Sequence, residues 1–173
     1  MSPSPAFPPT DIRAFLSFCA GEWMALRSTF LPDDAAAALE AGALEAGEGD
    51  EWHSSERGEL TIHYQEPSGV EELGDLLISG PGASPGRRIR FAASGDFEAG
   101  GDRGRWQLWP DGSLELLLSR DGVAVSERIW FTKPNLRLRS TIERHADGRP
   151  LRASFSSEIR RVSRPAPNTA PAG

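Results

Sequence analysis

The sequence predicts an all-β protein, an antiparallel up-and-down barrel with a short N-terminal helix. Its 173 residues include 18 glycines and 14 prolines and show little unbroken helical periodicity, which favours short strands joined by turns. Three Asp-Gly dipeptides, at residues 111–112, 121–122 and 147–148, separate strand-like segments and are typical of tight hairpins. About nine antiparallel strands in neighbour order would leave two exposed edges unless the sheet closed into a barrel. Such a barrel can hold one small ligand.

The N-terminal segment predicts a short amphipathic helix. Thr10 is a candidate N-cap, and apolar residues recur at helical spacing from Ile12 to Cys19. Gly21 then offers a left-handed stop. We expect the apolar stripe to pack over one end of the sheet, and the alternative is a helix that binds a partner.

The remaining segments are predicted as strands and one long loop. Residues 22–30 form the first predicted strand, which carries Arg27. Residues 32–51 are rich in alanine and acidic side chains and are interrupted by glycines, which indicates a long loop with weak helix. Eight further strands are predicted at residues 58–65, 71–79, 87–93, 104–109, 114–120, 123–132, 136–143 and 152–162.

A chain of this length suits a single domain, here residues 10–162. Residues 1–9 and 163–173 are rich in Pro, Ser and Ala and are predicted to be disordered tails. The single cysteine, Cys19, excludes an internal disulfide, and the chain shows no signal peptide or membrane-length apolar run, so we expect a cytoplasmic protein. A net charge of −6 disfavours nucleic acid and anionic membranes as partners. A small ligand or a protein partner is the expected class.

Several common kinds of catalytic site find no support in the sequence. The three histidines do not stand at metal-ligand spacing, so no metal site is expected. No phosphate-binding loop, nucleophile elbow or dinucleotide fingerprint is present. Cys19 lies on the apolar stripe of the predicted helix, and we interpret it as a small buried hydrophobe rather than a nucleophile.

Two predicted strands carry an unusual set of charged residues. Glu127 lies on one face of its strand, and Arg137, Arg139 and Thr141 share one face of the next. Strand periodicity leaves two alternatives: the arginines point into solvent, or they line a cavity. Buried, uncompensated guanidinium groups would each cost several kcal/mol, so a cavity would require a ligand that carries carboxylates. Trp130 is a candidate flat wall for a conjugated ligand.

Three segments resemble the S/U-type phycobiliprotein chromophore lyases: residues 126–141, residues 153–160, and the N-terminal helix that runs into residues 20–29. The resemblance implies a lipocalin-like barrel of about ten strands. It also implies a bilin-binding lyase that attaches a linear tetrapyrrole, phycocyanobilin or phycoerythrobilin, to a cysteine of an apo-phycobiliprotein subunit through a thioether. Ser156 stands where many relatives have cysteine, which agrees with chemistry that needs no enzyme thiol.

The resemblance also implies residue roles. Glu127 is placed beside the bilin nitrogens as the catalytic acid, and Arg137 and Arg139 are placed against the propionates. The bilin is expected as a transferred substrate rather than a permanently bound cofactor, and a second copy or a related lyase subunit is a further candidate partner. The predicted ligand-binding residues are Arg27, Arg137, Arg139, Thr141, Trp130 and Glu158.

Two other functions fit the same residues. The barrel could be a non-catalytic, lipocalin-like carrier of a tetrapyrrole or a fatty acid. Alternatively, the arginine face could be an exterior docking surface for another chain, in which case no pigment would bind.

Overall fold

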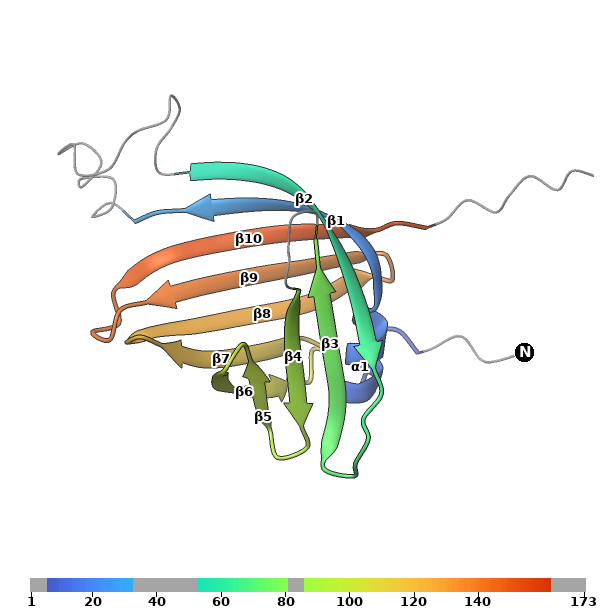
Figure 1. Ribbon diagram of the computed structural model, residues 1–173. Coiled ribbons are helices and arrows are strands. Elements are labelled where there is room, and N and C mark those ends of the chain that lie inside the picture. The colour runs from blue at the N-terminus through green and yellow to red at the C-terminus, as the bar shows by residue number, and fades with distance from the viewer. Residues whose placement is uncertain (1–5, 33–52, 81–85, 163–173) are drawn as a thin grey trace, which may run out of the picture.

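The computed structural model describes residues 6–32, 53–80 and 86–162, which form one helix and ten strands. The strands close into an antiparallel barrel with α1 at one end (Figure 1), as the sequence predicts. The elements are α1 Ile12–Cys19, β1 Gly21–Phe30, β2 His53–Gln65, β3 Glu72–Ser79, β4 Arg87–Ala92, β5 Asp96–Ala99, β6 Asp102–Leu108, β7 Leu114–Arg120, β8 Val123–Lys133, β9 Leu136–Arg144 and β10 Pro150–Arg160.

Each strand pairs with its neighbours in the sequence, and β10 pairs with β1 to close the barrel. The three Asp-Gly dipeptides lie in the turns that follow β6, β7 and β9, where the hairpins were predicted. Between β7 and β8 both turn residues have positive φ, 51° at Asp121 and 77° at Gly122. Positive φ at both central positions matches the twist of the flanking strands, so this turn fixes the register of the hairpin.

The structure corrects several predicted boundaries. β5 was not predicted, because four residues between glycine turns show too short an alternation to be distinguished from a loop. β2 begins at His53 rather than at residue 58, because β1 pairs with it along its whole length up to Phe30. The loop predicted at 32–51 lies almost wholly outside the described residues.

Helix α1 closes one end of the barrel and covers the apolar core. Asp11 is its N-cap, accepting a hydrogen bond from the backbone N–H of Ala14 at 2.9 Å, so the predicted cap at Thr10 is off by one residue. The apolar face of the helix is buried, as predicted, and Cys19 is 1% exposed. Phe18 packs edge-on against Phe131 of β8 with ring centroids 4.8 Å apart. The other large buried side chains of this core are Phe15, Leu16, Trp23, Ile62, Ile89, Phe91 and Leu114.

Part of the predicted N-terminal tail lies against this end of the barrel. Phe7 packs on Phe18 with ring centroids 5.9 Å apart, and Pro9 is fully buried. Residues 6–9 therefore contribute to the closed end. Across the described ranges, no helix has the length and apolar character required to cross a bilayer.

The barrel interior includes one position where only glycine fits. Gly104 of β6 pairs with Phe97 of β5, and the Phe97 ring lies over it. A Cβ at Gly104 would lie 2.5 Å from the ring and would also collide with the backbone oxygen of Leu117. Since the Leu117 backbone belongs to the neighbouring strand, the clash cannot be relieved by a side-chain rotation.

We expect Gly104→Ala to lower the free energy of unfolding by about 1–3 kcal/mol, the usual effect of overpacking. Urea unfolding followed by tryptophan fluorescence measures this change. Gly58→Ala is the matched control, because Gly58 also lies in a strand but has no atom within 4 Å of an added Cβ. Equal stability of the two variants would contradict the packing seen around Phe97.

Candidate functional site

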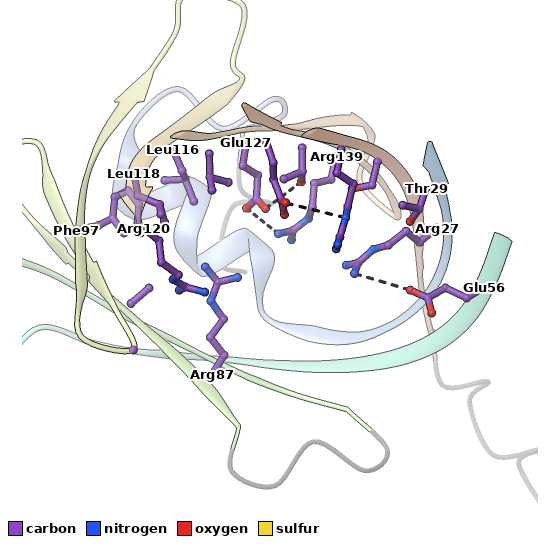
Figure 2. A pocket seen from close by; sticks show the side chains of 17 residues that line it. Arg27, Thr29, Glu56, Arg87, Phe97, Leu116, Leu118, Arg120, Glu127 and Arg139 are labelled. Carbon is purple, nitrogen blue, oxygen red and sulfur yellow. Dashed lines mark hydrogen bonds and ion pairs between the residues drawn. The ribbon is translucent and has the colours of Figure 1, made fainter. Parts of the chain in front are cut away.

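The barrel encloses a cavity of about 470 Å³ at the end away from α1 (Figure 2). That volume lies in the range of about 300–1,000 Å³ typical of small-molecule sites. Its lining is unusually rich in charge, with five arginines and three glutamates. The charged lining residues are Arg27, Arg87, Arg120, Arg139, Arg152, Glu56, Glu127 and Glu143, and the apolar ones include Phe97, Leu116, Leu118 and Val125.

The β8–β9 register brings three of the predicted site residues together on the cavity wall. Glu127 lies opposite Thr141, and Arg139 lies one inward position deeper, opposite Ile129. The Arg139 Nη1 donates a hydrogen bond to Glu127 Oε1 at 2.8 Å, and the Thr141 hydroxyl donates to Oε2 at 3.3 Å. The side chains of Arg139 and Glu127 are only 11% and 13% exposed. The arginine face therefore points inward, which answers the question that strand periodicity left open.

Arg137 and Glu158 lie beneath this wall, one inward position closer to α1. Arg137 is 1% exposed, Glu158 is fully buried, and Arg137 Nε donates to Glu158 Oε2 at 2.5 Å. The Arg137 guanidinium also stacks on Trp23, 4.6 Å from the ring centroid. Arg137 does not line the cavity. Because Glu158 and Trp23 already enclose its guanidinium, this geometry favours a supporting position for Arg137 over the direct propionate contact that the resemblance implies.

Glu158 joins the two arginines into one buried network. Its Oε1 lies 3.3 Å from Arg139 Nε, although neither atom has a hydrogen-bond partner within the described residues. Burial would raise the pKa of Glu158, but Arg139 and Arg137 outweigh it and lower that pKa below its ordinary value. Burial would likewise lower the pKa of Arg139, but Glu127 and Glu158 raise it. Both groups are therefore held in their charged forms.

Arg27 of β1 lines the cavity. Its Nε donates to the hydroxyl of the buried Ser156 at 3.2 Å, and its Nη1 lies 3.9 Å from Glu56 of β2. The side chain of Arg27 remains 44% exposed. It can therefore reach a ligand in the cavity mouth.

Trp130 lies on the other face of β8 and does not line the cavity. Glu127, Ile129 and Phe131 occupy the inward positions of this strand, so the period of two directs Trp130 outward. Its ring lies 6.2 Å from that of Phe155, which is 41% exposed. This position does not favour the predicted role of Trp130 as a wall for a ligand in the cavity.

Two further arginines of the cavity were not predicted from the sequence, Arg87 of β4 and Arg120 of β7, the strand next to β8. For Arg120, the alternation of residues along its strand could have predicted this position. Leu114, Leu116 and Leu118 alternate on the inward face of β7, and the same period continues to Arg120. Burial lowers the pKa of Arg87, and the charges of Arg139 and Arg120 lower it further while Glu127 opposes them.

Comparisons with known proteins agree on one family. A family profile described as "CpeS-like protein" matches residues 91–161. Chromophore lyase CpcS/CpeS 1 of Paulinella chromatophora is 41% identical over 160 residues, which cover 91% of this chain and 92% of that protein. A chromophore lyase CpcS/CpeS 1 of Trichodesmium erythraeum is 46% identical over 59 residues, 34% of this chain and 33% of that protein.

The fold is also found among solved structures. The S-type phycobiliprotein lyase CPES of Guillardia theta superposes with a TM-score of 0.54 at 19% identity, over 87% of this chain and 92% of that one. At this level of identity the likeness shows a shared barrel. It agrees with the expected barrel of about ten strands.

We expect Glu158→Gln to lower the free energy of unfolding at pH 7 by about 3–5 kcal/mol, because it leaves buried arginines without their carboxylate. The pKa of Glu158 is lowered in the folded protein, so its charge stabilises the fold above the ordinary carboxyl range. That contribution is lost as pH falls through the lowered pKa. The difference in the free energy of unfolding between wild type and Glu158→Gln should therefore become smaller below about pH 4.

Urea unfolding at a series of pH values between 3 and 7 measures this difference. Glu143→Gln is the matched control, since its ion pair with Arg152 is long, at 4.0 Å, and partly exposed. Glu143→Gln should lower the free energy of unfolding by only about 0–1 kcal/mol. A deficit for Glu158→Gln that does not change with pH would show that charge pairing is not its cause.

Proposed function

The chain belongs to the CpcS/CpeS chromophore lyase family, and we propose that it attaches a linear tetrapyrrole to a cysteine of an apo-phycobiliprotein subunit through a thioether. Phycocyanobilin and phycoerythrobilin are the proposed substrates. The observation that carries the proposal is the Glu127–Arg139 pair, held inside a cavity of about 470 Å³. A conjugated pigment with carboxylate side chains and pyrrole N–H groups is complementary to such a wall.

In this proposal the ligand lies along the polar wall of the barrel. The Glu127 carboxylate accepts hydrogen bonds from pyrrole N–H groups, and Thr141 and Arg139 hold that carboxylate in place. Arg27, which is partly exposed at the mouth, reaches a propionate. Arg137 and Glu158 act from below as positioning residues, because they fix Arg139 without touching the ligand.

A carboxylate beside the tetrapyrrole raises the pKa of its pyrrole nitrogens and favours the protonated, cationic form. Protonation makes the ethylidene carbon of the bilin more electrophilic. The thiolate of the client cysteine forms a bond to that carbon, the π electrons of the double bond move into the cationic tetrapyrrole, and no group leaves. The proton lost by the thiol balances the proton already held by the pigment.

The chain itself supplies no nucleophile to this reaction. Cys19 is the only cysteine in the sequence; it is the last residue of α1 and is buried against the core, and burial raises its thiol pKa. A buried thiol with a raised pKa is a poor nucleophile. The proposed contribution of the protein is therefore orientation of the pigment and stabilisation of its protonated form.

Glu127→Gln preserves the shape of the side chain but removes its charge. We expect the bilin to remain bound with its absorption shifted to shorter wavelength, and the transfer rate to fall roughly tenfold or more, since a nearby charge shifts a pKa by about 1–3 units. Absorption spectra and the rate of thioether formation measure the two effects. Glu115→Gln is the control, because Glu115 pairs with Trp109 Nε1 and does not line the cavity. A wild-type spectrum and rate for Glu127→Gln would contradict the proton role.

A transfer assay separates a lyase from a carrier. The purified chain is mixed with phycocyanobilin and an apo-phycobiliprotein subunit, and the modified peptide is mapped. We expect thioether formation at one cysteine, faster than the spontaneous reaction. Tight pigment binding without any acceleration would instead support the carrier.

A further inference from the structure

The arginines of the cavity differ in whether the protein already neutralises them. On the wall formed by β1, β2 and β8 to β10, each of three arginines faces a glutamate. The pairs are Arg139–Glu127 at 2.8 Å, Arg27–Glu56 at 3.9 Å and Arg152–Glu143 at 4.0 Å. This wall therefore carries no excess charge among its lining residues.

The remaining part of the lining, from β4 to β7, carries the uncompensated charge. Arg120 is paired with Asp102, with both Nε and Nη2 at 2.5 Å from Oδ2. Arg87 makes no hydrogen bond or ion pair with any residue in the ranges that the structure describes. The single carboxylate here, that of Asp102, pairs with Arg120, so the positive charge of Arg87 is left over on this part of the lining.

The two guanidinium groups approach each other inside the cavity. In Figure 2 the side chain of Arg87 points into the cavity and its guanidinium lies toward that of Arg120. Burial lowers the pKa of Arg87 most; the carboxylate of Glu127 opposes this, and the charges of Arg139 and then Arg120 lower the pKa further. Like charges brought together in this way are stabilised by an anion between them.

We propose that Arg87 and Arg120 form an anion subsite that binds one carboxylate of the ligand across the cavity from Arg27. The inference rests on the proposed function, in which the ligand is a linear tetrapyrrole with two propionates. One propionate lies near Arg27 and the other is taken by Arg87 and Arg120. Because these two positions lie on different walls, the subsite fixes the orientation of the pigment and selects for a diacid.

The subsite is tested by titrating the full chain with phycocyanobilin and with its dimethyl ester, followed by absorption. Arg87→Gln should weaken binding of the diacid roughly 10- to 100-fold, the usual effect of losing a charge-assisted hydrogen bond. It should leave the affinity for the dimethyl ester within about twofold of wild type, because the ester carries no charge to pair. Arg87→Lys should keep part of the preference for the diacid.

Arg90→Gln is the matched control on the same strand. Arg90 faces outward and lies 3.8 Å from Asp75, so its removal changes the net charge equally without touching the cavity. The control should bind both forms of the pigment as wild type does. Thermal unfolding of each variant shows whether the fold is retained.

The outcomes separate the inference from the proposed function. If the wild-type chain binds neither form of the pigment, both are overturned. If it binds and transfers the diacid but Arg87→Gln binds equally well, the subsite alone is overturned. Equal losses of affinity for the diacid and the ester in Arg87→Gln would also overturn the subsite, because they would show that Arg87 shapes the cavity rather than pairing with a charge.

Discussion

The structure depends on a row of alternating charges that runs from the core into the cavity: Arg137, Glu158, Arg139 and Glu127. Each inner member is almost inaccessible to water, and an isolated charge at that depth would cost several kcal/mol. The row is tolerated because each charge has a neighbour of opposite sign. The register of β8, β9 and β10 is thereby constrained, since a slip of one residue would turn every member to the outer face.

This row also divides the barrel into two functional halves. On the side of α1, Trp23 and Phe131 pack into a dry core, and the helix closes the end. On the other side the interior remains open and is lined by charge. The buried pair of Arg137 and Glu158 stands at the boundary, where it supports Arg139 from below. A cavity that is polar on its walls and firmly closed at its base suits an elongated pigment held for reaction at its exposed end.

The chemistry available in such a cavity follows from what its residues can hold and what they lack. Carboxylate and guanidinium groups can bind a zwitterionic pigment and favour its protonated form. The single thiol of the chain is buried at the end of α1, so in the proposed function bond formation falls to a cysteine of the client. The distribution of charge over the two walls adds orientation to this arrangement. The glutamates neutralise one wall, while Arg87 remains without a partner in the described residues on the other.

Local pattern in the sequence was sufficient to predict every described strand except β5, the Asp-Gly hairpins and the shared face of Arg137 and Arg139, because these depend on a period of two and on turn chemistry. The sequence could not determine which face was inward or how deep each residue would lie. Only the closed barrel decided that Arg139 reaches the cavity, that Arg137 is sealed by Glu158, and that Trp130 faces outward. The closed barrel also places Arg87 of β4 in the same cavity as Arg139. The physical reason is that depth and proximity depend on the register between strands and on the helix that closes one end, and these are properties of the whole barrel.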